Sequence, residues 1–144
     1  MLAIESVNHV GVRVRDKSRS ISFYRTLGFE VTQDTGFEQG HPVVITHPCG
    51  VVLNLLGPAN TPPGSNILMD VEQKHPGYTH IALTVSSLTD ATELMTSVDI
   101  EITGSFSFGN MSAVFIRDPD RNVIELDAYQ DPDGKDGVYY SVHP

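Results

Sequence analysis

The chain contains an internal repeat with an offset of 71 residues. The offset carries His9 to His80, Phe37 to Phe108 and Pro48 to Pro119 without a gap. Ten of the 48 aligned positions from 9 to 56 are identical, whereas chance gives roughly one in fifteen for ordinary composition. Two copies are too few for a solenoid. The repeat therefore predicts two equal modules related by an approximate twofold axis.

Each copy has the same order of predicted elements. It opens with an alternating apolar run, at residues 7–14 and 78–85, which is typical of a strand. A helix follows: Asp16 and Ser87 are cap-type residues, and apolar residues recur behind them at helical spacing. These helical stripes are Ile21, Tyr24 and Leu27 in the first copy, and Ala91, Leu94 and Val98 in the second. Three further strands are expected at 29–35, 42–46 and 51–56, and again at 101–105, 112–117 and 122–128. The fold class is α+β, with two tandem βαβββ modules.

The expected domain boundaries follow from the repeat. Residues 1–130 form a single domain made of modules at about 4–57 and 77–130. Residues 58–76 are rich in Pro, Gly and Asn, which is linker composition. Within this linker, residues 67–69 are expected to be either a short strand or a hydrophobic patch on the other module. The tail, 131–144, either docks or lies loose.

Composition excludes several classes of protein. A formal net charge of −9 argues against a nucleic-acid partner, which requires clustered lysine and arginine. No apolar run approaches the roughly 20 residues that span a bilayer, and no signal peptide is evident. The single cysteine, Cys49, fits a reducing compartment. The sequence therefore predicts a soluble, cytoplasmic protein without nucleic-acid or membrane partners.

Four polar residues occupy matching places in the two copies. His9 and His80 lie in the first strands, on the face opposite the aliphatic residues, and Asn54 and Glu125 lie in the last strands. A carboxylate in an apolar strand is costly unless it is paired or bound to a cation. Two imidazoles and one carboxylate form a set that binds a divalent transition ion and leaves positions open. We predict that His9, His80 and Glu125 bind a metal, whereas Asn54 is a ligand, holds a bound water or lines the pocket.

Other candidates have an equally ordinary interpretation. Arg13 shares the face of His9 and pairs with an anionic group of the substrate, or is a solvated or structural arginine. Phe37, Phe106 and Phe108 form an apolar wall of the substrate site, or are packing residues. A strand histidine is also often a hydrogen-bonded packing residue, which is the alternative for His9 and His80.

Several motifs resemble the vicinal oxygen chelate superfamily, which includes glyoxalase I, methylmalonyl-CoA epimerase, fosfomycin and bleomycin resistance proteins and extradiol dioxygenases. The resemblance covers residues 7–129. It rests on Asn8-His9-Val10, the segment 20–29 (SISFYRTLGF), Thr79-His80-Ile81-Ala82-Leu83, and Asp118-Pro119-Asp120 before Ile124-Glu125-Leu126. It implies paired modules that form a cupped mixed sheet with helices on the outer face. It also implies a divalent ion (Zn, Ni, Co, Mn or Fe) that binds two vicinal substrate oxygens and stabilises an enediolate or related anion.

The sequence departs from individual members of this superfamily. Glyoxalase I-like enzymes have a glutamate where Asn54 stands, and an amide cannot accept a proton in the useful pH range. Glu125 would therefore serve as both ligand and base. Epimerase-like enzymes have a glutamine at the Asn54 position, which is more similar. Arg13 matches a glyoxalase residue that contacts the glutathione carboxylate. The extra histidine and tyrosine of catechol dioxygenases fall on Phe106 and Phe115.

The resemblance leaves three functions open. The first is a metal-dependent lyase or isomerase of the glyoxalase type, which acts on a small substrate with vicinal oxygens. The second is a non-enzymatic protein that sequesters a drug or hydrophobic ligand. The third is an Fe(II)-dependent dioxygenase. A homodimer is expected from the resemblance.

Overall fold

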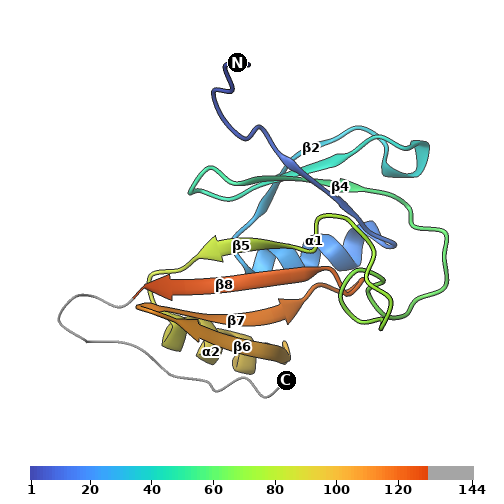
Figure 1. The fold of residues 1–144 in the computed structure, drawn as a ribbon. Coiled ribbons are helices and arrows are strands. Elements are labelled where there is room, and N and C mark those ends of the chain that lie inside the picture. The colour runs from blue at the N-terminus through green and yellow to red at the C-terminus, as the bar shows by residue number, and fades with distance from the viewer. Residues whose placement is uncertain (130–144) are drawn as a thin grey trace. The chain divides into compact units, whose positions relative to one another are not determined.

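The computed structural model describes residues 1–129, and the predicted tail at 131–144 lies outside them. All eight predicted strands and both α-helices are present (Figure 1). The first copy consists of β1 (Val10–Arg13), α1 (Lys17–Thr26), β2 (Glu30–Asp34), a short 3-10 helix η1 (Phe37–Gln39), β3 (Val43–Thr46) and β4 (Val52–Leu56). The second consists of β5 (His80–Thr84), α2 (Leu88–Ser97), β6 (Ile102–Phe108), β7 (Met111–Arg117) and β8 (Val123–Tyr129). The predicted tandem βαβββ fold is confirmed.

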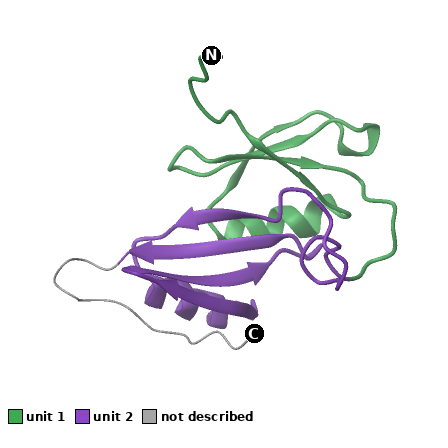
Figure 2. Cartoon of the chain, in the orientation of Figure 1, with its two compact units in different colours: residues 1–64 green, residues 65–144 purple. Residues whose placement is uncertain are grey.

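The chain divides into two compact units, unit 1 at residues 1–64 and unit 2 from residue 65 onward (Figure 2). Each unit contains one mixed four-stranded sheet. The strand order is β1-β4-β3-β2 in unit 1 and β5-β8-β7-β6 in unit 2. In each sheet the first strand runs parallel to the last strand, and the other pairs are antiparallel. The two sheets thus have the same topology, as the repeat requires.

The strand register confirms the 71-residue offset. Gly11 pairs with Asn54 in unit 1, and Ala82 pairs with Glu125 in unit 2. Adding 71 to each residue of the first pair gives the second pair. Each polar position of the last strand therefore lies in the same place in its own sheet.

The helix caps follow the same repeat. The side chain of Asp16 accepts a hydrogen bond from the backbone N–H of Arg19 at 2.7 Å. The hydroxyl of Ser87, 71 residues later, accepts one from the backbone N–H of Asp90 at 3.1 Å. Both caps satisfy an N–H group that the first helical turn leaves unpaired. The predicted start of each helix is therefore correct.

The core of each unit comes from alternating strand residues. In unit 1, β3 buries Val43 and Ile45, and β4 buries Leu53 and Leu55. Figure 1 shows α2 along one face of the second sheet, where it contacts β7 and β8. The residues buried on that side of β7 and β8 are Val114, Ile116, Ile124 and Leu126. The opposite face of this sheet carries the polar residues of interest.

The predicted apolar stripe of α2 is wrong. The helix buries Leu88, Thr92 and Met95, whereas Leu94 and Val98 are 43% and 41% exposed. Thr92 is tolerated in the packed row because its hydroxyl donates to the carbonyl of Thr89 at 2.9 Å. The hydropathy pattern misses this packing face because it counts threonine as polar, although the hydroxyl of Thr92 is hydrogen-bonded within the helix.

Two further differences concern segment ends. Residues 67–69 form a turn instead of a strand, because Asn66 Oδ1 accepts from the N–H groups of Leu68 and Met69. Strand β6 extends to Phe108, beyond the expected end at 105, since it continues to pair with β7 as far as Met111.

Neither α-helix of the described residues has the length and apolar run that a bilayer crossing requires.

Candidate functional site

The turn between β7 and β8 fixes the position of the predicted ligand strand. Asp118 is buried, and its Oδ1 atom accepts hydrogen bonds from the backbone N–H groups of Asp120 and Asn122, both at 2.9 Å. Its Oδ2 atom accepts from the side-chain amide of Asn122 at 2.8 Å. Arg121 occupies the left-handed region at φ 68°. The turn places Glu125 directly opposite Phe115 in the ladder.

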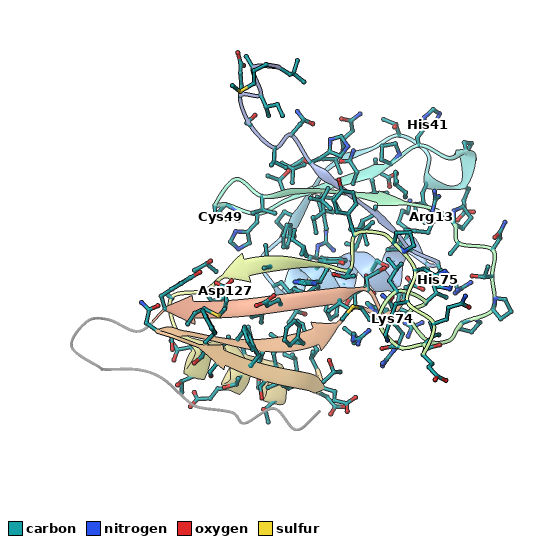
Figure 3. The ribbon with its side chains drawn as sticks, viewed as in Figure 1. Arg13, His41, Cys49, Lys74, His75 and Asp127 are labelled. Carbon is teal, nitrogen blue, oxygen red and sulfur yellow. The ribbon has the colours of Figure 1, made fainter. Side chains whose placement is uncertain are left out.

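The equivalent turn in unit 1 has the same backbone and a different cap. Gly50, 71 residues before Arg121, has φ 97°. The ring nitrogen Nδ1 of His47 accepts from the backbone N–H of Cys49 at 3.1 Å, where Asp118 accepts in unit 2. Cys49 is exposed in this turn (Figure 3). The two turns therefore use different side chains to hold matching strands.

Strand β8 places Glu125 beside His80. The Nε2 atom of His80 lies 3.0 Å from Oε2 of Glu125, and the side chains are 33% and 11% exposed. The ring of Phe115 meets the imidazole edge to face, with centroids 6.0 Å apart. Two of the three predicted metal ligands are thus neighbours within unit 2.

Both predicted imidazole ligands are held by the residue that precedes them. Nδ1 of His80 lies 2.9 Å from the hydroxyl of Thr79, and Nδ1 of His9 lies 2.7 Å from Oδ1 of Asn8. Since the amide oxygen of Asn8 only accepts, the contact of His9 with this oxygen requires Nδ1 to be the donor. A hydrogen-bond partner on one ring nitrogen commonly orients a metal-binding histidine; the other nitrogen of His80, Nε2, faces the carboxylate of Glu125. Sequence reasoning missed Asn8 and Thr79, because their contact depends on side-chain rotamers.

The pair in unit 2 fits a divalent ion. The 3.0 Å separation of His80 Nε2 and Glu125 Oε2 is that of an ion pair when the imidazole is protonated. Two ligands at about 2.1 Å from one ion lie roughly 3 to 3.4 Å apart, so an ion could replace this contact with little movement of the two side chains. No group of three or more His, Cys, Asp or Glu side chains within residues 1–129 could hold an ion. His9 belongs to unit 1, so the triad of His9, His80 and Glu125 stays a prediction.

The remaining predicted residues lie in several environments. Asn54 is half-buried on β4, paired in register with Gly11, and Arg13 is exposed at the end of β1 (Figure 3). Phe37 is buried in unit 1, where its ring lies so close to Gly57 that a Cβ there would fall 2.2 Å from it. Its position is that of a packing residue. Phe106 and Phe108 are 38% and 76% exposed on β6.

Asp127 was not singled out by the sequence analysis. It lies on β8 (Figure 3), two residues beyond Glu125, and is 8% exposed. Successive side chains of a strand alternate between faces, so Asp127 shares the face of Glu125. The repeat could have identified Asp127, because this carboxylate aligns with the apolar Leu56.

Comparisons with known proteins agree with this architecture. A sequence profile of the Glyoxalase/Bleomycin resistance protein/Dioxygenase superfamily matches residues 6–126. The chain is 28% identical over 138 residues to the glyoxalase domain-containing protein RDO1 of Mycosarcoma maydis, with 90% of this chain and 72% of that protein covered.

Two solved structures share the fold. A glyoxalase/dioxygenase from Nostoc punctiforme superposes with a TM-score of 0.69 at 21% identity, covering 90% of this chain and 100% of that one. TnmS3, an antibiotic binding protein from Streptomyces sp. CB03234, gives a TM-score of 0.68 at 21% identity, also over 90% and 100% of the two chains. At this level of identity the likeness concerns the fold alone.

Proposed function

Because this chain belongs to the glyoxalase/bleomycin resistance protein/dioxygenase superfamily, we propose that it is a metal-dependent enzyme that isomerises or cleaves a small substrate with vicinal oxygens. The observation that supports this most directly is the 3.0 Å approach of His80 Nε2 to Glu125 Oε2. The ion would be held by His80, Glu125 and His9. Zn, Ni, Co, Mn and Fe all suit imidazole and carboxylate ligands.

A bound divalent ion supplies Lewis-acid stabilisation of negative charge on two adjacent oxygens. Glu125 contributes a second carboxylate oxygen beyond the one that faces His80, and this oxygen is the candidate acceptor for a substrate proton. The amide of Asn54 donates or accepts hydrogen bonds and takes up no proton. The proton-transfer role therefore belongs to Glu125 alone among the four symmetry-related residues.

Metal content provides the first test. Purified protein, as isolated and after incubation with each candidate ion, is analysed by mass spectrometry for bound metal. We expect about one bound ion per metal site. The ion should be lost in His80→Ala while the circular dichroism spectrum stays unchanged. His41→Ala, an exposed loop histidine (Figure 3), is the matched control and should keep the ion. Equal metal content in His80→Ala and the wild type would refute the assignment.

The reaction is tested with a panel of substrates. Thiol hemiacetals, acyl-CoA thioesters and diols each present adjacent oxygens or an acidic proton next to a carbonyl. We expect turnover of one class that depends on the added ion and is lost in Glu125→Gln. Light scattering on the same samples tests the proposed homodimer.

Ligand sequestration without chemistry is the second candidate. It is supported by Phe106 and Phe108, two partly exposed aromatic residues on one strand, and by the shared fold with an antibiotic binding protein. Protein that takes up no ion yet binds hydrophobic compounds would favour this function. Stoichiometric metal together with turnover would exclude it.

A further inference from the structure

Asp127 is a buried carboxylate with an unsatisfied oxygen. The residue is 8% exposed, and its Oδ1 atom is enclosed without a hydrogen-bond donor from anywhere in residues 1–129. Burying a charged group without a compensating partner is costly. Orphaned atoms of this kind are rare in folded proteins and require an explanation.

The fold does not require a carboxylate at this position. Leu56 stands 71 residues earlier in the matching strand β4, in register with Arg13 as Asp127 is in register with Thr84. In unit 1 the side chain of Leu56 covers β1, since a Cβ added to Gly11 would lie 3.2 Å from its Cδ1 atom. An apolar residue thus packs well at this place. We therefore expect the aspartate to lower the stability of the fold relative to a leucine at this position.

The neighbours of Asp127 in its sheet are small or aromatic. The cross-strand row runs from Thr84 through Asp127 and Ala113 to Phe106. Thr84 is exposed on the edge strand, and Phe106 is 38% exposed at the other end of the row. This row contains no lysine or arginine. The cation of β7, Arg117, is held by Asp70 at 2.9 Å.

We propose that Asp127 binds a positively charged nitrogen of the ligand, so that the molecule taken by this site is an amine with an apolar or aromatic body. A carboxylate in a low-dielectric position attracts a cation strongly, and Phe106, two strands away in the same row, offers an aromatic side chain to the body of the ligand. The inference rests on the proposed function, because it places the ligand on the sheet face that carries Glu125. Two strand residues span about 7 Å, which sets the distance between the amine and the metal-bound end.

The test uses three probes that differ in one group. 2-Phenylethylamine, 2-phenylethanol and 3-phenylpropionate are cationic, neutral and anionic molecules of similar size. Each is titrated into chelator-treated protein, and the dissociation constant is read from amide chemical shifts in NMR spectra. Removing metal first eliminates repulsion between an ion and the amine. We expect the amine to bind at least about tenfold more tightly than the alcohol, and the acid to bind most weakly.

Two variants remove the carboxylate. Asp127→Leu copies the residue of the matching strand, and Asp127→Asn keeps the shape; both should bind amine and alcohol equally. Both should also fold, and Asp127→Leu should melt at a higher temperature than the wild type. Asp99→Asn makes the same change in net charge at an exposed position after α2 and should keep the tenfold preference. A wild type with no preference for the amine, or a preference that survives Asp127→Leu, would overturn the inference.

The outcome is separable from that of the proposed function. Metal retained without amine preference removes the role of Asp127 and leaves the metal site intact. Amine preference in a protein that takes up no ion removes the metal-dependent function and keeps the cation site. His80→Ala should lose metal while its chelator-treated form still discriminates amine from alcohol.

Discussion

The orientation of the two histidines at the candidate metal site depends on the hydrogen bond at Nδ1 of each imidazole. Thr79 and Asn8 contact Nδ1 of His80 and His9, respectively. Partners of this kind orient metal-binding histidines and fix their tautomer. The hydrogen bonds are the same in position and different in chemistry, because a hydroxyl replaces an amide across the repeat.

Thr79→Val should therefore weaken metal binding by about tenfold or more. The variant keeps the shape of the side chain and removes the hydroxyl that orients His80. The dissociation constant is measured by competition with a chromophoric chelator, and the ring tautomer by nitrogen-15 NMR. Thr35→Val, at an exposed position, serves as the control. If Thr79→Val binds metal as tightly as the wild type, Thr79 does not position the ligand.

At this scale the sequence predicted the proximity of His80 and Glu125, since strand alternation and the repeat place both on one face. It did not predict Asn8, Thr79 or Asp127. The first two act through rotamers, which alternation does not determine. Asp127 was not predicted, although its mismatch with the apolar Leu56 in the repeat is visible in the sequence.

At the scale of elements, the β7–β8 turn controls where the ligand strand lies. Asp118 accepts three hydrogen bonds in a buried position. Asp118→Ala leaves these donors without their acceptor, and we expect the free energy of unfolding to fall by about 2 kcal/mol. Urea unfolding measures this change. Asp120→Ala removes a carboxylate from the same turn and serves as the control for loss of charge. It should lower the free energy of unfolding by less than Asp118→Ala does. Equal losses would show that the hydrogen bonds to Asp118 are not the cause.

Asp70 links the segment after residue 64 to the same turn. Its carboxylate lies 2.9 Å from Arg117 and 3.6 Å from Arg121. Burial acts to raise the pKa of Asp70, but the backbone N–H of Asn66 and the charges of Arg117 and Arg121 outweigh it, so the pKa lies below its ordinary value of 3.8. A lowered pKa means that the ion pair stabilises the fold above pH 3.8, and that this stabilisation is lost as the pH falls through the folded-state pKa.

Asp70→Asn should accordingly lower the free energy of unfolding by roughly 1 kcal/mol at pH 7. The difference between variant and wild type should shrink as the pH is lowered from about 4, because the wild-type carboxylate then becomes protonated as well. Denaturant titrations across this pH range measure it. A difference that stays constant down to the most acidic pH would mean that charge plays no part.

Element boundaries were largely predictable because capping and alternation are local properties. Asp16 and Ser87 begin their helices as expected, and the strand pairings follow the repeat. The α2 stripe was wrong because Thr92 is buried with its hydroxyl bonded inside the helix, which hydropathy cannot reveal. The sequence leaves residues 67–69 open between a short strand and a hydrophobic patch, because their turn depends on the side chain of Asn66, which closes it.

At the scale of the whole molecule, the duplication gives four equivalent positions, and three of them carry residue types that can bind a metal. His9, His80 and Glu125 are conventional metal ligands, whereas Asn54 offers a neutral amide. The register of Asn54 with Gly11 repeats that of Glu125 with Ala82. A carboxylate at 54 would complete the symmetric set.

Asn54→Glu should therefore tighten metal binding by at least about tenfold, because a charged oxygen replaces a neutral one near a divalent ion. The added charge is half-buried, so the metal-free variant should be less stable than the wild type, and metal should raise its melting temperature by more than it raises that of the wild type. Chelator competition and melting curves with and without metal test both effects. Asn60→Glu adds the same charge at an exposed loop position and should change neither. Unchanged or weaker metal binding by Asn54→Glu would mean that the two copies do not present their last strands to one ion, and the twofold argument for the site would fail with it.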